Sequence, residues 1–594
     1  MSIPTRLLAA GVAGLILTGS LVVPTVATSA AAAVPAPDTT SPLEAWRVDS
    51  VPTPHLPWYK CYGTAQCATV RLPLDYDDPY GETVEIAVLK MKARKPASRI
   101  GSLFVNPGGP GGSGTEMAAL SPLFLSGAVL DRFDVVGFDP RGVGFSDNLK
   151  CFPTTARQTQ VLSGLQAFFP HGANQERGYV NSAQAVGRGC SRTGAKLAGA
   201  MSTAEVARDM DVLRRAVGDK KLTYLGFSYG SLLGQYYANM FPDRVRALAL
   251  DGIINPITWV GSPATANRLL DDRLNSADGA YKALQRLLIR CDQAGEKRCM
   301  FAKGDPRKHF EAIARKLRAK PLVLGTDEDL GPVRLTYADF VGITLMGLYT
   351  PVAGELVTAI ASLIETLLAD PAATTGAQRS AARSALRERL THVRAPGRDF
   401  PYDNSYEAFA GVMCTDALHP GDAGGWPALT AAADRRAPYF GRAWGWSSVP
   451  CAGDTWTVRD EDAYQGPFNR RTSAPVLVVG NYWDPATNYG QAVSAARLLP
   501  NSRLLTSDNW GHTAYGTSTC VTRAIDTYLV RGSVPPAGTK CHSPLQPFTG
   551  NGGIPLLLSA GAEPATMGAQ AGDHVAVPGG AKALPPVRAP HPYH

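Results

Sequence analysis

The sequence predicts an α/β fold in which helices cover both faces of a mostly parallel central sheet. Short apolar runs that fit buried strands alternate with stretches that have the apolar spacing of amphipathic helices. Parallel strands need crossover connections, which are usually helical, so this alternation favours a parallel sheet covered on both sides. The strand-like runs also stop near residue 254 and resume at Val476, which predicts a single sheet with one long excursion.

The first expected strands form a hairpin. Ala68–Leu74 and Thr83–Met91 flank the turn-rich stretch Asp75–Glu82. The later predicted strands are Ser102–Val105, Phe133–Phe138, Leu222–Leu225, Ala247–Leu250, Val476–Val479 and Arg503–Leu505. The helices predicted between them include Thr203–Val217, Ser231–Met240 and Ala486–Leu498.

The excursion is predicted to be a helical lid over residues 255–471. Long helical patterns dominate it, notably Asn267–Arg290, Pro306–Ala319 and Pro351–Ala369. An independent domain is the alternative, but strands that resume after it favour an insertion into one sheet. The core would then consist of residues 45–254 and 472–548.

The N-terminal residues 1–36 read as a secretory signal peptide. An apolar stretch over Leu7–Val23 follows a single Arg and precedes small residues that suit a signal peptidase. An uncleaved membrane anchor is the alternative, but three glycines interrupt the apolar stretch. We therefore expect a secreted, extracellular protein without stable membrane association.

Composition and charge are those of an ordinary globular protein. Of the 594 residues, 45% are hydrophobic and 18% charged, and the formal net charge of +8 is spread without a polybasic run. We expect that the protein binds no nucleic acid and that it is a monomer. Residues 549–594 are rich in Pro, Gly and Ala without periodicity, which is typical of a disordered tail.

Ten cysteines in an exported chain favour disulfides. A zinc site is the alternative, but the sequence has no C-x2-C pair. Sequence does not fix connectivity. Pairing close neighbours would join Cys61 to Cys67, Cys291 to Cys299 and Cys520 to Cys541, leaving Cys151 with Cys190 and Cys414 with Cys451.

A candidate nucleophile follows one of the predicted strands. Leu222–Leu225 runs directly into Gly226-Phe227-Ser228-Tyr229-Gly230, and a helical stretch follows at once. This strand, turn and helix are the context of a nucleophile elbow, in which a strained turn presents the serine hydroxyl. Glycines on both sides of the serine avoid clashes with the strand and the helix. The pattern predicts that Ser228 is the nucleophile of a serine hydrolase.

A glycine-rich loop precedes the elbow in the expected order. Asn106-Pro107-Gly108-Gly109-Pro110-Gly111-Gly112 follows the predicted strand Ser102–Val105. Its backbone N–H groups could approach a developing oxyanion closely. We expect the N–H of Gly108 or Gly109, with that of Tyr229, to form the oxyanion hole. A phosphate-binding loop is the alternative, but it would end in Gly-Lys-Ser/Thr, which is absent.

The base and the acid should follow later strands of this fold. His512 follows the strand Arg503–Leu505 and precedes a predicted helix near Thr517, so we expect it to be the base. Asp484 follows the strand Val476–Val479, with Pro485 expected to open the next helix, and is the expected acid. Asp251, at the end of an earlier strand, is the rival acid.

A further strand end carries two charged residues. Asp139 and Arg141 follow Phe133–Phe138, and we expect them to stabilise that loop as a pair rather than to take part in catalysis.

Together these motifs resemble the α/β-hydrolase peptidases, specifically the secreted actinobacterial tripeptidyl aminopeptidases, relatives of the prolyl aminopeptidases. The resemblance runs from about Cys61 to Phe548. It includes Cys67-Ala68-Thr69-Val70, Asn106 to Gly114, Asp139 to Gly144, Gly226 to Gly230, Asp484-Pro485-Ala486-Thr487, Gly511-His512 and Pro535 to Cys541. Pro107 stands where prolyl aminopeptidases usually carry His, so strict proline specificity is not implied.

The resemblance implies a serine peptidase that releases short peptides, often tripeptides, from free N-termini, without a metal or organic cofactor. The rival functions are a carboxylesterase or lipase and a catalytically silent binding protein. An exopeptidase needs an anion for the substrate's ammonium group. The candidates in the sequence are Asp403, Glu407 and Asp416, within the predicted lid.

Overall fold

The computed structural model describes residues 35–327, 331–370, 372, 374–393 and 404–550. Residues 1–34 of the expected signal peptide, Asp403 and nearly all of the expected tail lie outside the described residues. The two predicted parts of the core and the predicted lid are described with the gaps given above.

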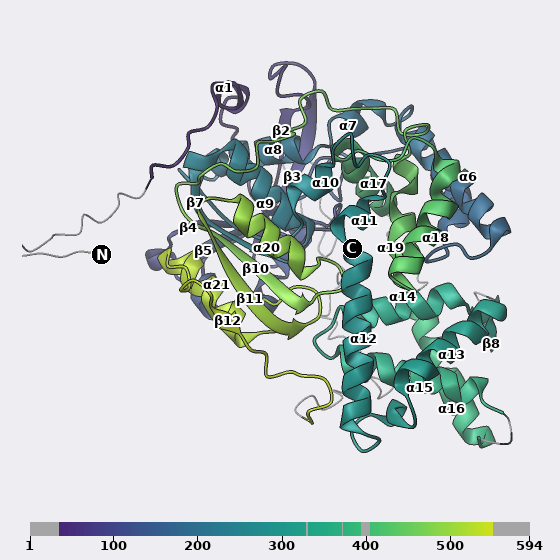
Figure 1. Ribbon diagram of the computed structural model, residues 1–594. Coiled ribbons are helices and arrows are strands. Elements are labelled where there is room, and N and C mark those ends of the chain that lie inside the picture. Colours follow the sequence, from purple (N-terminus) through teal and green to yellow (C-terminus); the bar gives the residue numbers. More distant parts are fainter. Residues whose placement is uncertain (1–34, 328–330, 371, 373, 394–403, 551–594) are drawn as a thin grey trace, which may run out of the picture. The chain divides into compact units, whose positions relative to one another are not determined.

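A sheet of ten strands forms the centre of the chain, in the order β1-β2-β3-β5-β4-β6-β7-β10-β11-β12 (Figure 1). The pairs β1–β2, β2–β3 and β3–β5 are antiparallel, and every later neighbour pair from β5–β4 onward is parallel. The predicted hairpin is β2 and β3, which pair from Gln66 opposite Lys90 to Pro73 opposite Thr83. The strands are β1 Tyr59–Cys61, β2 Ala65–Pro73, β3 Thr83–Met91, β4 Gly101–Asn106, β5 Phe133–Phe138, β6 Leu222–Phe227, β7 Val245–Asp251, β10 Val476–Trp483, β11 Ser502–Trp510 and β12 Lys540–Cys541.

Helices cover both faces of this sheet because successive strand residues point to opposite sides. Val476 and Val478 belong to one buried cluster with residues of α8, α9 and α20. Leu477 and Val479 belong to another, with residues of α2, α4 and α21. The fold is therefore the predicted one, a mostly parallel sheet between two layers of helices. The helices of this part are α1 Pro42–Asp49, α2 Gly114–Ala119, α3 Ser121–Phe124, α4 Gly127–Leu130, α5 Thr155–Leu162, α6 Ala173–Cys190, α7 Ala195–Gly199, α8 Thr203–Ala216, α9 Tyr229–Met240, α20 Tyr489–Leu498 and α21 Thr519–Arg531.

The inserted segment, residues 252–475 between β7 and β10, is mainly helical and supplies most residues of a further buried cluster, which also includes residues of α6, Trp510 and Phe548. It also holds a short antiparallel pair, β8 Leu322–Asp327 and β9 Gly331–Leu335, which the sequence analysis did not predict. Its helices are α10 Pro256–Val260, α11 Leu270–Leu274, α12 Ser276–Ala294, α13 Pro306–Ala319, α14 Tyr337–Leu348, α15 Ala353–Leu368, α16 Gly376–Val393, α17 Ser405–Asp416, α18 Trp426–Arg436, α19 Phe440–Gly445 and the 3₁₀ helix η7 Trp446–Cys451.

Two helix predictions needed correction. The expected helix Asn267–Arg290 is divided into α11 and α12 by Asn275, whose φ of 56° lies in the left-handed region. Asn tolerates this conformation better than most residues, so apolar spacing alone could not reveal the break. Pro485 does not open a helix, because α20 begins at Tyr489 with Asn488 as its N-cap.

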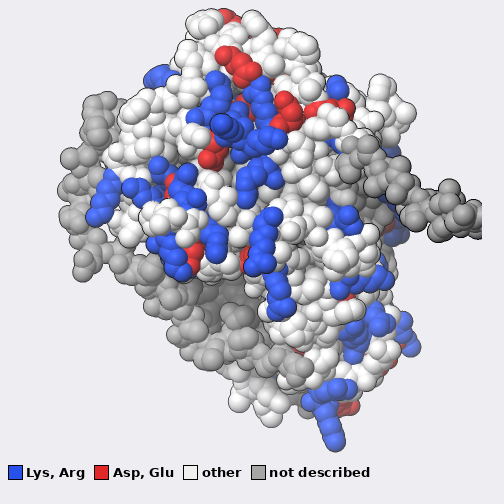
Figure 2. Space-filling view, turned by 90° about the vertical axis from the view of Figure 1, so that its left-hand side faces the viewer, with Lys and Arg blue, Asp and Glu red and all other residues white. Residues whose placement is uncertain are grey.

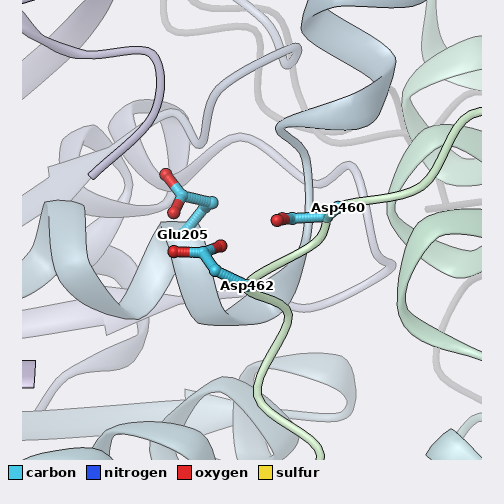
Figure 3. Close-up of side chains that lie close together, drawn as sticks. All are labelled: Glu205, Asp460 and Asp462. Atoms are coloured by element: carbon cyan, nitrogen blue, oxygen red, sulfur yellow. The ribbon is translucent and has the colours of Figure 1, made fainter. Parts of the chain in front are cut away.

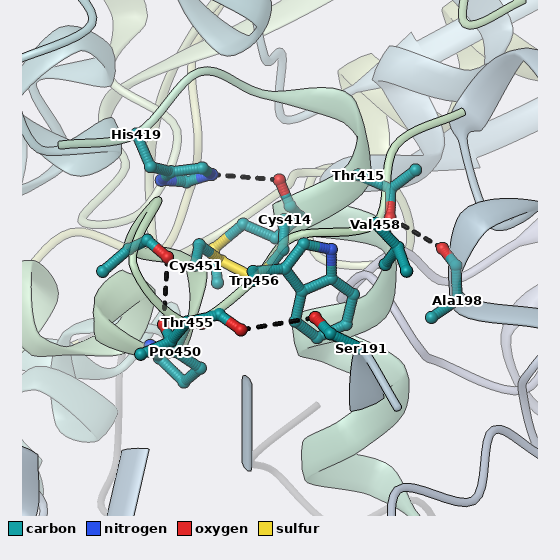
Figure 4. The surroundings of a disulfide bond; sticks show 12 residues. Ser191, Ala198, Cys414, Thr415, His419, Pro450, Cys451, Thr455, Trp456 and Val458 are labelled. Atoms are coloured by element: carbon teal, nitrogen blue, oxygen red, sulfur yellow. Dashed lines mark hydrogen bonds between the residues drawn. A yellow bond between two sulfur atoms is a disulfide. The ribbon is translucent and has the colours of Figure 1, made fainter. Parts of the chain in front are cut away.

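All five disulfides join the close neighbours expected from the sequence. The Cys414–Cys451 bridge links α17 to η7 within the inserted segment (Figure 4). Hydrogen bonds also hold the end of α17: Thr415 Oγ1 donates to the carbonyl of Ala198 in α7 at 2.8 Å, and His419 Nε2 contacts the carbonyl of Met413 at 3.1 Å. Burial lowers the pKa of His419 to about 3, so this ring is neutral at physiological pH.

Asp139 and Arg141 stabilise the loop after β5, but they do so with separate partners rather than as a pair. Asp139 accepts hydrogen bonds from Ser113 Oγ and from the backbone N–H of Thr115 and Phe145. It thereby ties the end of the glycine-rich loop to β5. The guanidinium of Arg141 is fully buried and binds carboxylates of α8, Glu205 and Asp209.

Charges of both signs lie on the surface. On the face in Figure 2, Lys and Arg side chains form scattered groups, and Asp and Glu lie beside several of them. The exposed ion pairs include Arg94 and Lys95 with Asp131. Within the described residues, the helices are all too short or too polar to cross a membrane.

Candidate active site

Ser228 lies in the turn between β6 and α9 and has a φ of 55°. A non-glycine residue rarely adopts this backbone conformation, which indicates a turn held by its surroundings. The N–H of Ser228 donates to the carbonyl of Asp251 on the neighbouring strand at 2.9 Å. Close contacts explain the flanking glycines. A Cβ on Gly226 would lie 2.4 Å from the carbonyl oxygen of Gly230, and a Cβ on Gly230 would lie 2.7 Å from that of Asn106.

The glycine-rich loop after β4 packs directly against this turn. A Cβ on Gly108 would lie 2.4 Å from the carbonyl oxygen of Phe227 and 2.9 Å from the backbone nitrogen of Tyr229. The N–H of Gly108 donates to Asn106 Oδ1 at 2.9 Å, so this group already has an acceptor. Gly109 lines the cavity next to Ser228. Of the two loop glycines expected at the oxyanion hole, Gly109 thus lines the cavity, and Gly108 makes the close approach to the elbow.

Asp484 and His512 follow adjacent parallel strands and meet. His512 Nδ1 lies 3.0 Å from Asp484 Oδ1 and 2.9 Å from Oδ2. Asp484 also accepts hydrogen bonds from the N–H groups of Ala486 and Thr487, and from Thr487 Oγ1 at 2.9 Å. The contact of Thr487 with the acid was not predicted from the sequence. Thr487 follows Asp484 by three residues, a spacing at which Ser, Thr and Asp side chains form local hydrogen bonds in turns.

Burial alone would lower the pKa of His512, but the charge and the hydrogen bond of Asp484 outweigh it, and the charge of Asp251 adds to them. The net effect raises the pKa of His512 above its usual value. Proton uptake by its ring is thus favoured when a hydroxyl in the cavity gives up a proton.

The rival acid, Asp251, has a different set of partners. Its Oδ2 accepts the N–H groups of Ala514 and Tyr515, each at 2.8 Å. Asp251 thereby anchors the backbone just after His512, while Asp484 contacts the imidazole itself. Burial raises the pKa of Asp251 to about 6, and the nearby charge of Asp484 contributes to the rise.

Ser228 and His512 line one cavity of about 740 Å³. Part of the lining consists of core residues such as Gly109, Phe227 and Thr513. The cavity-lining residues on helices of the inserted segment, which we call the cap wall, belong to α10, α11, α12, α14, α17, α19 and η7, from Trp259 to Ser447. The lining is mostly apolar and aromatic.

Comparisons with known proteins agree with this architecture. Residues 101–283 match the family model described as alpha/beta hydrolase fold, and residues 437–541 match the one described as TAP-like protein. The tripeptidyl aminopeptidase of Streptomyces coelicolor is 31% identical over 487 residues, which cover 80% of this chain and 83% of the relative. The serine protease Hip1 of Mycobacterium tuberculosis is 31% identical over 82% of this chain and 89% of its own.

The chain belongs to the tripeptidyl aminopeptidase-like family of α/β hydrolases. The relatives also include a protein of Mycobacterium tuberculosis named carboxylesterase B, which is 32% identical over 80% of this chain and 86% of the relative.

Two of the three acids predicted to bind the substrate's ammonium group can be placed in this hydrolase, and both have hydrogen-bond partners within the protein. Glu407 is fully buried and accepts from Gln158 Nε2 at 2.8 Å. Asp416 accepts from the N–H and hydroxyl of Thr203 and from Trp259 Nε1. Burial raises the pKa of Asp416 to about 6. Neither residue lines the cavity, so neither is part of the ammonium site proposed below.

One group of described acids in the hydrolase has the spacing of a metal site. Glu205, Asp460 and Asp462 point toward one another, with ligand atoms within 4.8 Å (Figure 3). Arg208 pairs with Glu205 at 2.7 Å and with Asp462 at 2.6 Å, and Arg141 pairs with Glu205 at 2.6 Å. These guanidinium groups already offset the carboxylates, so the group fits an ion-pair network better than a cation site.

Proposed function

We propose that this hydrolase is an exported serine peptidase that releases short peptides, in particular tripeptides, from the free N-termini of polypeptides. The observation that carries the proposal is the strained Ser228 in one cavity with His512, whose imidazole is paired with Asp484. A relative named tripeptidyl aminopeptidase, matched over most of both chains, supports the substrate class.

In the proposed reaction, His512 Nε2 takes the hydroxyl proton of Ser228 as the serine oxygen attacks the carbonyl carbon of the scissile bond. The N–H groups of Gly109 and Tyr229 stabilise the oxyanion. His512 then gives its proton to the leaving amine, which leaves an acyl-enzyme on Ser228. Water, activated by the same imidazole, hydrolyses the ester and restores the serine. Asp484 holds the imidazole and stabilises its charged form throughout.

Export is supported by the disulfides. Five bridges use all ten cysteines of the chain. Such bridges form and persist in oxidising compartments and are rare in the cytosol. The expected leader at residues 1–36 provides the route.

Ester hydrolysis is the second candidate function, because one relative is named carboxylesterase B. The same serine, imidazole and oxyanion hole hydrolyse esters as readily as amides. The apolar lining of the cavity would also accept the acyl part of an ester.

A panel of substrates would separate the two. Tripeptidyl and aminoacyl p-nitroanilides should be compared with short and long p-nitrophenyl esters, with Ser228→Ala as the control. We expect tripeptidyl anilides to be cleaved best and Ser228→Ala to be about 10⁴-fold or more slower. Cleavage of long-chain esters without cleavage of any peptide anilide would refute the peptidase proposal.

A further inference from the structure

The cap wall places a single carboxylate in the cavity. Asp271 is the one Asp or Glu among the described residues that line it, and none of those lining residues is Lys or Arg. Asp271 lies in the first turn of α11 and is 7% exposed. The cavity around Ser228 therefore has one carboxyl group within a mostly apolar and aromatic lining.

The protein itself does little to neutralise the charge that this group carries when it is ionised. Asp271 Oδ2 accepts a hydrogen bond from Ser447 Oγ at 3.0 Å. Arg273, two residues later, directs its guanidinium at the carbonyls of Thr258, Trp259, Arg268 and Leu418. Arg436 pairs instead with Asp272 and Asp278. Neither arginine forms an ion pair with Asp271, although the charge of Arg273 lowers the pKa of Asp271 and so offsets part of the effect of burial.

Burial raises the pKa of Asp271 to about 7, and the charge of Asp272 contributes. A buried carboxylate that pairs with no cation is destabilising, so the group takes up a proton more readily unless a ligand supplies a positive charge. The ligand that fits is a small cationic group that can enter the cavity and reach Asp271, attached to an apolar portion that contacts the rest of the lining.

Resting on the peptidase function proposed above, we propose that the Asp271 carboxylate binds the N-terminal ammonium group of the peptide substrate. It thereby determines which peptide bond reaches Ser228. This assigns Asp271 as a specificity-determining residue, in place of the acids that the sequence suggested.

Tyr349 connects this carboxylate to the reacting centre. Its ring packs edge-on against the imidazole of His512, with ring centroids 5.1 Å apart. Burial raises the pKa of its phenol, and the charges of Asp484 and Asp271 both contribute. The phenol is therefore close enough to both carboxylates to be affected by their charges, and Asp271, Tyr349, His512 and Ser228 all line one cavity. In the proposed binding mode, a ligand held at Asp271 reaches Ser228 through this cavity. An extended peptide covers about 3.3–3.6 Å per residue, so the span between the two sites selects the length of the released peptide.

The test uses the full-length exported protein with a free tripeptidyl p-nitroanilide and its N-acetylated counterpart. The variant is Asp271→Asn, which keeps the shape of the side chain and an acceptor for Ser447. Asp272→Asn is the matched control, because it removes a neighbouring charge that does not line the cavity. A p-nitrophenyl ester monitors Ser228 independently of the ammonium group.

We expect the wild type to prefer the free peptide, and Asp271→Asn to lose at least about 30-fold in kcat/KM on it. The loss should lie mainly in KM and should not appear with the acetylated peptide or the ester. Asp272→Asn should keep the preference. If the wild type prefers free peptides and Asp271→Asn keeps that preference, Asp271 is not the ammonium site, while the peptidase function stands. If the wild type hydrolyses the ester but shows no preference for free peptides, the aminopeptidase function and this inference both fail.

A second measurement does not depend on the variant's folding. The wild-type ester hydrolysis is inhibited with n-hexylammonium and with neutral n-hexanol at pH 8. We expect the cation to bind at least about 10-fold more tightly, since it alone gains the charge interaction. Equal inhibition by the two compounds would overturn the inference.

Discussion

The proposed catalytic residues and the cap wall belong to one cavity, but they are built differently. Ser228 and Asp484 come immediately after β6 and β10, and His512 comes two residues after β11. The strands that precede these residues pair in parallel with their neighbours. The cap wall consists of helix residues from distant parts of the inserted segment, held by packing and by the Cys414–Cys451 bridge. In the proposed function, the catalytic groups are thus attached to the sheet, and the residues that select the substrate to the helices.

The first prediction tests whether Asp484 and Asp251 have the different roles that their contacts indicate. Asp484→Asn should reduce kcat by about 10⁴-fold, since the imidazole loses the partner that holds its tautomer and stabilises its charge. The matched control is Asp251→Asn, whose remaining oxygen can still accept from Ala514 and Tyr515. We expect it to lose less than about 10-fold.

Steady-state kinetics on a tripeptidyl anilide measure both variants, and thermal unfolding confirms that both are folded. A loss for Asp251→Asn as large as that for Asp484→Asn would show that the anchoring of the His512 loop matters as much as the direct contact.

The same contrast explains what the sequence could predict. The elbow, Asp484 and His512 could be proposed from the sequence because each follows an apolar strand run at a position that backbone geometry restricts. Asp271 could not be proposed this way. It lies on α11, a helix of five residues whose boundary with α12 depends on the left-handed Asn275. Its exposure to the cavity depends on how α11 packs against η7, which no local pattern encodes. The strand pairs β8–β9 and β11–β12 were not predicted, for a similar reason. Pairing with a neighbouring strand, rather than a local sequence pattern, makes β8, β9 and β12 strands.

The second prediction breaks the close contact that supports the elbow. Gly108→Ala would place a Cβ 2.4 Å from the carbonyl oxygen of Phe227, so the loop or the elbow must shift. A displacement of about 1 Å at the reacting atoms lowers the rate about 10²-fold. Gly218→Ala is the matched control: its φ of 86° is also positive, but its Cβ would meet nothing within 4 Å.

Both alanine variants should be destabilised by about 1–3 kcal/mol through backbone strain. Only Gly108→Ala should lose kcat/KM, measured below the unfolding transition. An unchanged rate for Gly108→Ala would mean that the elbow tolerates movement of the loop.

The third prediction concerns what holds the cap wall. Replacing Cys414 and Cys451 by Ser opens a loop with a sequence separation of 37, whereas replacing Cys61 and Cys67 opens one of 6. Loop-closure entropy gives losses of about 4 and 2 kcal/mol, respectively. Denaturant unfolding at 25 °C measures both.

The two double variants should also differ in activity. The Cys414 and Cys451 variant loosens α17 and η7, which carry cavity-lining residues including Ser447, so its KM for free tripeptides should rise. The Cys61 and Cys67 variant changes only the start of the sheet and should keep its KM. The reverse order of KM effects would contradict a cap wall that selects the substrate.

The smallest expected effect is a difference between the pH dependence of catalysis and the pH dependence of substrate binding at the cap wall. Catalysis needs a neutral His512, so kcat/KM falls as the pH drops through the raised pKa of this residue, whichever substrate is used. Binding of a free ammonium group also needs an ionised Asp271, whose pKa is about 7. The charged groups near Asp271 are Asp272, which raises its pKa, and Arg273, which lowers it. The phenol of Tyr349 is neutral in this range because its pKa is raised.

For a free tripeptidyl anilide, KM should therefore rise about 10-fold per pH unit below pH 7, as Asp271 takes up its proton. It should rise again above about pH 8, as the substrate's α-amine, with an ordinary pKa of about 7.7–8.0, becomes neutral. The N-acetylated substrate carries no titrating amine, so its KM should stay flat over the same range while its kcat follows His512 alone. Parallel KM profiles for the two substrates would mean that the cap wall does not sense the charge of the N-terminus, and that selection depends on the shape of the apolar lining.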